Sequence, residues 1–433
     1  MNKSLHKLYF LAILLMMDFE GYSQATLSIT QAQEMAIERS PLQRQKLYLE
    51  TSAQLNSKSY RSINYPQLLL NAQASYQSDV FSLPFTVPGI DSPIIPQDQF
   101  KVGIDFYQNI YNGGASRAAT QIEDSKLQSD LQTLEVSFQQ IREVINSLFF
   151  GVLKAQEQIN LIDNVQKDLN NQKDILQAAV DQGAALPVSV KMLEKEIISM
   201  DQKLIELQSS RVALIEMLEK WIEQPLGQDV ILTFPETEIT PDEMIIDRPE
   251  SRQFDLQAGL LESRKSQLTA SRIPDIGLFG TAGLGYPNPL NFFEVEVAPY
   301  WLAGIKMSWR ILDYGKSSRD KEVLDLQQQS LNAAKQNFEK SIDINMTMKI
   351  ADIEKYRDLI EKDREIVRLQ DEIVSVSSSQ LQNGVINSND YITEVNKGLN
   401  ASISLRLHEI DLERTKIELI TLTGNSEKYE GNE

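Results

Sequence analysis

The two halves of this 433-residue chain repeat one another in register. Pro41 and Pro66 recur as Pro249 and Pro274, in both cases 208 residues later. Farther along, the segment VGIDFYQNIYNGG from Val102 matches AGIKMSWRILDYG from Ala303, 201 residues later. Gly183 matches Gly384 at the same spacing. The change in spacing indicates a longer loop in the first copy. Anchors in such constant order predict a tandem duplication, so the fold is built twice from one unit.

Two short segments in each copy alternate apolar and polar residues, which is typical of strands with one apolar face. We predict strands over about 66–78 and 99–111, and again over about 274–286 and 298–312. The residues predicted to face a membrane are Phe100, Val102, Ile104, Phe106, Trp301, Ile305, Met307 and Trp309. Transmembrane barrels use such strands, but a soluble sheet shows the same alternation, so the strands alone leave both possibilities open.

Long helical segments follow the strands in each copy. In residues 115–180 apolar residues recur every three or four positions, which is the heptad pattern of a coiled coil. Helical hairpins are predicted over 115–222 and 316–423, with their turns at Gly183 and Gly384. Each first helix reaches its glycine after 68 residues, roughly 100 Å at the rise of an α-helix.

The first 25 residues have the pattern of a secretory signal peptide. Lys3 and Lys7 precede the apolar run LYFLAILLMM, and small and polar residues follow as far as Ala25. The run is too short to span a bilayer as a helix, which needs about 20 residues. We therefore divide the chain into a signal peptide (1–25), a first repeat (26–230) and a second repeat (231–433).

The composition excludes most catalytic chemistry. The chain has no cysteine and two histidines, His6 and His408, so thiol catalysis, Cys-ligated metals and a His-based metal site or triad are not expected. Its 42 basic and 61 acidic residues give a net charge of −19, which argues against a nucleic-acid partner. We expect neither an enzyme nor a cofactor.

The strands and the helical rods together favour a membrane channel. Four strands cannot close a barrel, and open sheet edges are not tolerated in lipid. Several chains must then share one closed barrel, and three chains would supply twelve strands. The predicted fold class is mainly α with a small β part, built from a duplicated helix-strand-strand-long helix-helix unit.

At this point the sequence resembles the TolC family of outer-membrane efflux and secretion channels. The resemblance lies in the order of YP-x-L before the first strand, IYNGG ending at Gly114, ILDYG ending at Gly315, and the hairpin glycines. It implies a homotrimer with a twelve-stranded barrel in outer-membrane lipid and a twelve-helix tunnel across the periplasm of a Gram-negative bacterium. It also implies docking to a periplasmic adaptor (membrane fusion protein) that serves an inner-membrane RND or ABC transporter.

The resemblance places the periplasmic tips, where the adaptor would dock, at Gly183 with Ser189 and at Gly384 with Asp390. An acidic gate is expected at Asp390 and Glu394; a second gate acid one turn beyond Asp390 would fall at Thr393, and Glu394 lies beside that position. Asp390 and Ser189 have a second interpretation, because either residue type can cap the N-terminus of a helix.

The tyrosine and arginine that close the tunnel in other family members are missing. Leu381 and Ile386 stand at those positions, so the family's gating network is not expected here.

The predicted function is the outer-membrane exit duct of a tripartite efflux pump, which conducts drugs, dyes or toxic compounds passively. One alternative is the outer-membrane channel of a type I protein secretion system. A second alternative is a periplasmic coiled-coil adaptor or scaffold.

Overall fold

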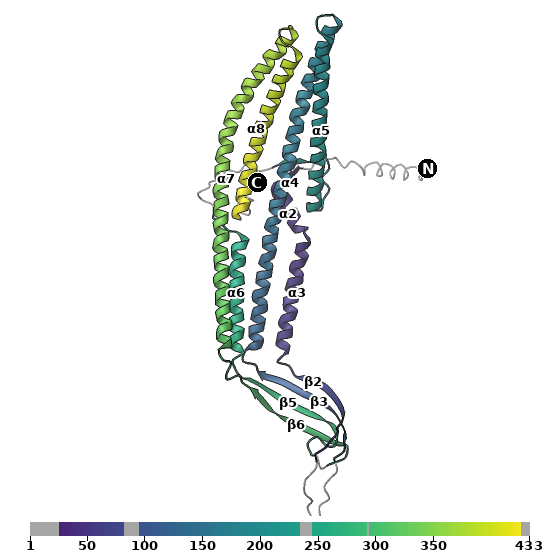
Figure 1. The fold of residues 1–433 in the computed structure, drawn as a ribbon, viewed down its shortest axis with the longest axis vertical. Coiled ribbons are helices and arrows are strands. Elements are labelled where there is room, and N and C mark those ends of the chain that lie inside the picture. Colours follow the sequence, from purple (N-terminus) through teal and green to yellow (C-terminus); the bar gives the residue numbers. More distant parts are fainter. Residues whose placement is uncertain (1–25, 82–94, 234–244, 292–293, 426–433) are drawn as a thin grey trace, which may run out of the picture. The chain divides into compact units, whose positions relative to one another are not determined.

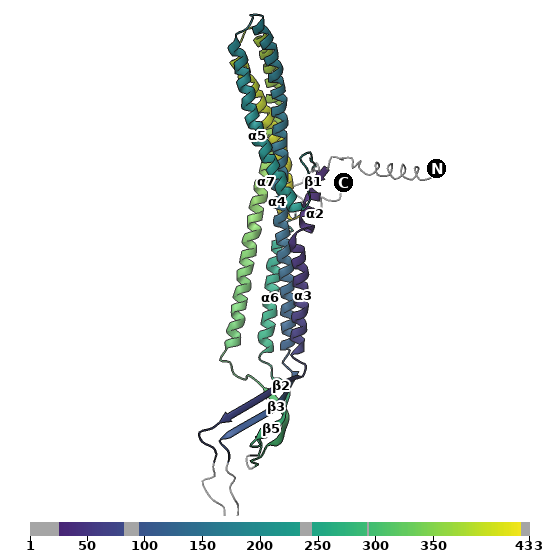
Figure 2. The same cartoon turned by 90° about the vertical axis from the view of Figure 1, so that its right-hand side faces the viewer.

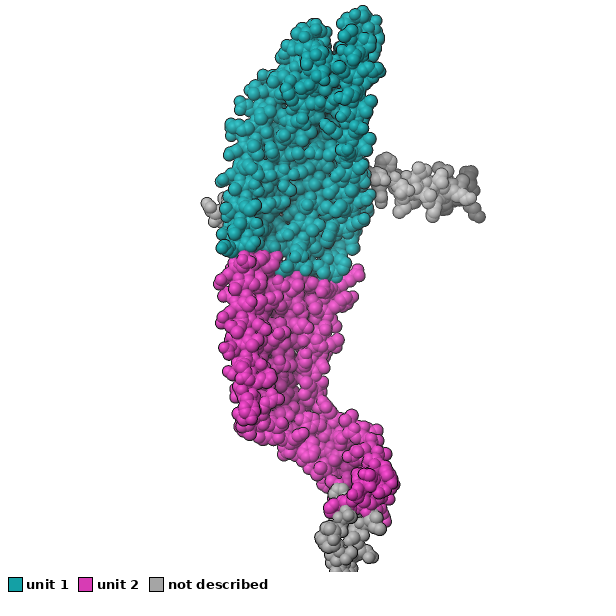
Figure 3. Space-filling view, in the orientation of Figure 1, with its two compact units in different colours: residues 1–43, 136–248, 340–433 teal, residues 44–135, 249–339 magenta. Residues whose placement is uncertain are grey.

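The computed structural model describes residues 26–81, 95–233, 245–291 and 294–425 (Figure 1). The predicted signal peptide lies outside the described residues. The chain forms two compact units (Figure 3). Unit 1 contains residues 1–43, 136–248 and 340–433, and unit 2 contains residues 44–135 and 249–339. Both copies of the repeat therefore contribute to both units.

The first half of the chain begins with small elements that the sequence did not reveal. These are β1 (Thr26–Ser28) and α2 (Ile29–Glu38). The elements of the repeat follow as α3 (Pro41–Ser62), β2 (Gln67–Tyr76), β3 (Asp98–Tyr111), α4 (Ala115–Asp181) and α5 (Pro187–Ile222).

The second half repeats this order after the short strand β4 (Ile231–Thr233). Its elements are α6 (Pro249–Ala270), β5 (Asp275–Tyr286), β6 (Ala298–Ser308), α7 (Lys316–Gln382) and α8 (Ser388–Thr423). The predicted fold class, a mainly helical chain with a small β part in a duplicated arrangement, is confirmed.

The strand β6 ends at Ser308, four residues before the predicted limit of 312. Ser308 pairs with Asp275, the first residue of β5, and the residue before it is Pro274. Proline has no N–H to give to a ladder, so pairing stops there.

A four-stranded antiparallel sheet forms the β part of unit 2, with strand order β2-β3-β5-β6. The two hairpins of the duplication lie next to each other through β3 and β5, as Figures 1 and 2 show. In the same unit α3 runs along the first part of α4, where the Ser116 hydroxyl donates to the carbonyl of Tyr60 at 2.6 Å.

The heptad pattern of α4 forms the centre of the helical packing. Nearly every position of the predicted seam from residue 134 onward is buried. These residues are Leu134, Phe138, Ile141, Ile145, Leu148, Val152, Ala155, Ile159, Ile162, Leu169 and Leu176. Among the described residues, no helix combines the length and the apolar character that crossing a membrane requires.

A small layer in unit 1 packs beside the end of α5. The strands β1 and β4 pair in parallel, and Ser28 begins α2 with a capping box that it shares with Gln31. The Arg39 guanidinium donates to the carbonyls of Ile222 and Glu223 at 2.8 and 3.2 Å. Arg39 therefore gives the carbonyl groups at the C-terminus of α5 a cationic hydrogen-bond donor.

Candidate functional site

The register of the sheet in unit 2 places apolar residues on one face of all four strands. Leu70 pairs with Ile104, Ile104 with Ala282, and Ala282 with Trp301. The same face carries Leu68, Ala72, Ala74, Phe100, Val102, Phe106, Leu278, Leu284, Ile305 and Met307. The two copies therefore combine their apolar faces into one continuous surface.

This apolar surface is exposed. Trp301 and Ile305 have 75% and 72% of their surface exposed, and Ile104 has 51%. Phe106 is half-buried, and Trp309 lies just beyond β6, where its indole Nε1 donates to the carbonyl of Arg272 at 3.1 Å. Large exposed apolar surfaces are uncommon on soluble monomers and indicate contact with lipid or protein.

The opposite face of the sheet is polar and rich in glycine. Asp105 accepts from the Asn71 amide, and Lys101 and Tyr300 lie on the same face. A Cβ on Gly283 would lie 2.2 Å from the carbonyl oxygen of Val102, so this column of the sheet requires glycine.

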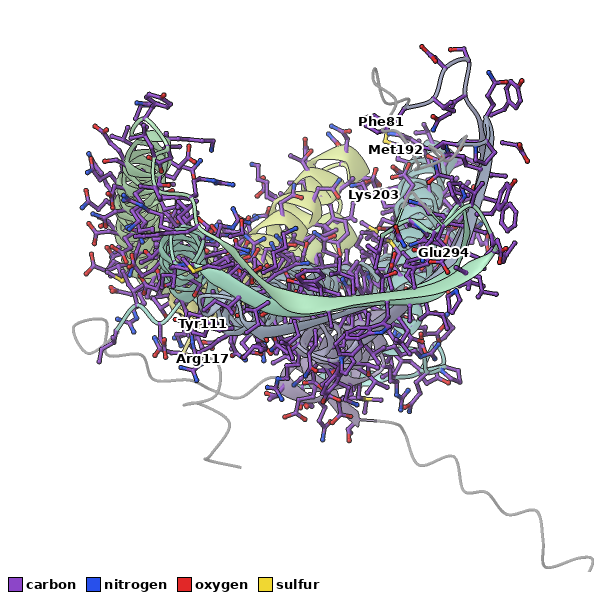
Figure 4. All side chains as sticks on the ribbon, turned by 90° about the horizontal axis from the view of Figure 1, so that it is seen from below. Phe81, Tyr111, Arg117, Met192, Lys203 and Glu294 are labelled. Atoms are coloured by element: carbon purple, nitrogen blue, oxygen red, sulfur yellow. The ribbon has the colours of Figure 1, made fainter. Side chains whose placement is uncertain are left out.

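Two aromatic rings on this polar face each cover a glycine on a neighbouring strand: Tyr107 lies over Gly277, and Phe279 over Gly304. Tyr300 of β6 reaches across β5, and its hydroxyl lies beside Gly103 of β3. Such cross-strand pairs fix the register, because the ring fills the space that a side chain would occupy. Figure 4 shows the sheet from below, where it curves across the view.

Both outer edges of the sheet are open. Within the described residues, β2 pairs only with β3 and β6 pairs only with β5. Each edge leaves a row of backbone N–H and C=O groups without a strand partner, which is a template for pairing with another chain.

The tips of the two helical hairpins lie in unit 1, and glycine makes both turns. Gly183 has φ +74° and Gly384 has φ +69°, in the left-handed region that favours glycine. A Cβ would meet nothing within 4 Å at either position, so each glycine faces open space where a side chain would lie.

The prediction that Asp390 and Ser189 cap their helices is wrong. The cap of α8 is Asn387, whose Oδ1 accepts from the amides of Asn389 and Asp390 at 2.9 and 3.0 Å. The α5 helix begins at Pro187 after Leu186, which makes no side-chain cap. Asp390 and Ser189 lie in the first turn of their helices, two residues after the first helical residue. Both helices begin closer to the tip glycine than the sequence spacing suggested.

The two acidic residues proposed as a gate differ in their contacts. Asp390 is exposed, and its side chain makes no hydrogen bond or ion pair within the described residues. Glu394 accepts from Lys397 at 2.9 Å and from Gln370 of α7 at 3.0 Å. These bonds, first that of Lys397, lower the pKa of Glu394. Glu394 therefore joins α8 to its own hairpin, whereas Asp390 is unengaged.

The two hairpins pack against each other near their tips. Leu381 is buried in a cluster that joins α4, α5 and α8, and Ile386 packs against it. Beside this cluster, the Ser378 hydroxyl and the Gln382 amide donate to Oε1 of the buried Gln172, both at 3.4 Å. Asn396 donates to Glu196 of α5 at 2.9 Å. Leu381 and Ile386 thus serve as core residues where other family members have a polar lock.

Residues 32–221 match the sequence model of a family described as outer membrane efflux protein. This part of the chain is similar to the outer membrane efflux protein family, which includes TolC. The matched family consists of outer-membrane efflux channels of the TolC type that extend into the periplasm, and it is not enzymatic.

Solved structures of outer-membrane proteins have the same fold. The outer membrane protein VceC of Vibrio cholerae is 15% identical with a TM-score of 0.67, covering 92% of this chain and 96% of that one. The open state of the MtrE outer membrane channel of Neisseria gonorrhoeae is 16% identical with a TM-score of 0.68, covering 92% and 88%. The CmeC outer membrane channel of Campylobacter jejuni is 14% identical with a TM-score of 0.65, covering 92% and 86%. Among curated proteins, none matches the sequence.

Proposed function

We propose that three copies of this efflux channel form one passive exit duct, with a closed twelve-stranded barrel in the outer membrane. The observation that carries this proposal is the sheet with an exposed apolar face and two open edges. A barrel removes both edges when β2 of one copy pairs with β6 of the next. The polar face with Lys101 and Asp105 then lines the lumen, where charge is tolerated.

Apolar stripes on the helices of unit 1 support assembly from several copies. On α7 the exposed residues Ile366, Leu369, Ile373 and Val376 follow a three-four spacing. On α5 Ile198, Ile205 and Val212 are exposed at intervals of seven. These helices lie at opposite edges of the unit (Figure 1), so α7 of one copy can pack against α5 of the next.

The tips at Gly183 and Gly384 would receive the adaptor of an inner-membrane RND or ABC transporter. Their free glycine turns leave the backbone open to a partner. Asp390, repeated three times around the axis, would form an acidic ring at the tunnel entrance. Together with the net charge of −19, this ring favours cationic substrates such as amphiphilic drugs and dyes.

Planar-bilayer recording tests the duct and its selectivity. The purified protein should conduct with a preference for cations, and Asp390→Asn should reduce that preference and raise conductance if the ring narrows the pore. The exposed Asn389→Ser is a matched control from the same helical turn, with no expected change in selectivity. Anion preference in the wild type would contradict the selectivity claim.

Deletion of the gene tests what is carried. Increased susceptibility to cationic dyes and antibiotics supports efflux. Unchanged susceptibility with loss of one secreted protein supports the alternative of type I secretion.

A further inference from the structure

A pocket of about 900 Å³ lies in unit 2, where the sheet meets the helices. It is lined by the end of α3, the end of β3 and the first turns of α4. Figure 4 shows Tyr111 and Arg117, two of its lining residues, next to each other. The pocket contains none of the tip or gate residues, so the proposed duct assigns no role to it.

One side of the pocket is cationic. Arg61 and Arg117 both line it, and neither guanidinium has an ion pair or hydrogen bond within the described part of the chain. The N-terminus of α4 opens onto the same space. The N–H of Ala115 donates to the carbonyl of Asn112 and that of Ala118 to the carbonyl of Gly114. This leaves the N–H groups of Ser116 and Arg117 without a backbone acceptor among the described residues. Gly114 has φ +84° with nothing within 4 Å of a Cβ position, so a ligand can approach these amides. Two guanidinium groups beside a helix N-terminus suit a phosphate.

The pocket also contains a buried acceptor that has no donor. Asn109 is 8% exposed and donates through Nδ2 to Asp275 at 2.8 Å. Its Oδ1 is buried and accepts no hydrogen bond from the described residues. A buried acceptor without a hydrogen bond destabilises the folded protein, so a ligand that donates a hydrogen bond to this oxygen would be favoured. The carboxylate of Asp124 also lines the pocket and favours a cationic donor such as an ammonium.

Exposed aromatic and aliphatic residues surround the same end of the sheet. Ile110 and Tyr111 in the pocket are 58% and 49% exposed, and Tyr65 at the start of β2 is 66% exposed. Trp309 and Tyr314 follow β6 and are also exposed. Aromatic residues of this kind gather at the level of lipid headgroups.

We propose that this pocket binds the headgroup of an ethanolamine phospholipid. The phosphate lies between Arg61, Arg117 and the N-terminus of α4, and the ammonium donates to Asn109 and faces Asp124. The inference rests on the proposed barrel, because only a sheet in the membrane brings the pocket to the level of the headgroups. A choline headgroup carries the same charges but no N–H, so it cannot satisfy Asn109.

Native mass spectrometry of the purified trimer, released from nanodiscs of equal ethanolamine and choline phospholipid, tests the proposal. The wild type should retain the ethanolamine lipid at least about fivefold over the choline lipid. The double variant Arg61→Gln/Arg117→Gln should lower lipid retention at least about tenfold. The double variant Arg44→Gln/Arg264→Gln removes two exposed arginines elsewhere in unit 2 that make no ion pair among the described residues, and its retention should equal that of the wild type.

Three results would overturn the assignment: equal retention by the two double variants, equal retention of the two lipids, or complete displacement of the lipid by inorganic phosphate. Oligomer mass and bilayer conductance are recorded on the same preparations. A wild type that neither trimerises nor conducts contradicts the duct, whereas lost lipid preference in a conducting trimer contradicts only this inference.

Discussion

The two long helices α4 and α7 are copies of one ancestral helix with different surroundings. Each has 67 residues, and each ends before a tip glycine. Most apolar residues of α4 are buried, and its large exposed ones are Val144 and Ile175. By contrast, α7 exposes Val323, Leu326, Ile344, Met348, Ile366, Leu369, Ile373 and Val376. Duplication supplied two equivalent helices, of which one packs within its own chain and the other exposes an apolar surface that would contact a second copy in the proposed trimer.

The largest expected effect comes from placing charges on the exposed apolar stripe of α7. Leu369→Glu/Ile373→Glu places two carboxylates in the proposed contact between copies, and burial of unpaired charge costs several kcal/mol. The trimer should dissociate, as measured by light scattering in detergent. Lys362→Glu changes the charge by the same amount at an exposed side chain of α7 and should leave the trimer intact. A trimer that survives the double substitution would show that α7 makes no contact between copies.

Alanine substitutions at equivalent positions compare how tightly the side chains of α4 and α7 are packed. Ile145 of α4 is fully buried, and its counterpart 201 residues later is the half-buried Met346 of α7. Ile145→Ala should reduce the free energy of unfolding by about 2–5 kcal/mol, and Met346→Ala by about 1–2 kcal/mol. Thermal unfolding followed by circular dichroism measures both. Equal losses would mean that α7 is as fully packed in the assembled protein as α4.

The capped and uncapped tips should differ in local stability. Asn387→Ala removes the side-chain cap of α8 and should cost about 1 kcal/mol. Leu186→Ala removes no cap from α5 and serves as the matched control. Hydrogen exchange should therefore become faster in the first turn of α8 and stay unchanged in that of α5. Similar acceleration in both tips would contradict the assignment of Asn387 as the cap.

The smallest expected effect is a pH dependence confined to the second hairpin. Glu394 corresponds to the buried Leu193 of the first hairpin, and its bonds to Lys397 and Gln370 lower its pKa. A lowered carboxylate pKa in the folded state contributes stability at neutral pH, and this contribution is lost as the pH falls below the usual value of about 4.5. Hydrogen exchange in α8 should accelerate over that range in the wild type and less in Glu394→Gln. Identical pH profiles would show that these bonds do not stabilise the tip.

The sequence predicted the features that arise from local periodicity. The seam of α4, the alternating strands and the turns at Gly183 and Gly384 each follow from spacing within one segment. Strands of three residues such as β1 and β4 are too short to show a period, and the end of β6 depends on Pro274, which directly precedes the paired strand β5.

Features that join distant segments could not be predicted. The pocket at Arg61 and Arg117 and the contact of Gln172 with Ser378 unite residues far apart in the sequence. The cap at Asn387 was missed because asparagine, serine and aspartate follow one another there, and any of them can cap a helix.

The central claim is that three copies close one barrel through the edges β2 and β6. Because the chain has no cysteine, pairs of cysteines can be introduced without background. Asn71→Cys on β2, combined in turn with cysteine at Tyr300, Leu302, Gly304 or Lys306 on β6, should give a disulfide between copies in at least one pair. Oxidation in the outer membrane should then yield covalent dimers and trimers and nothing larger. Absence of cross-links in every pair, or a ladder that continues beyond three, would contradict the account.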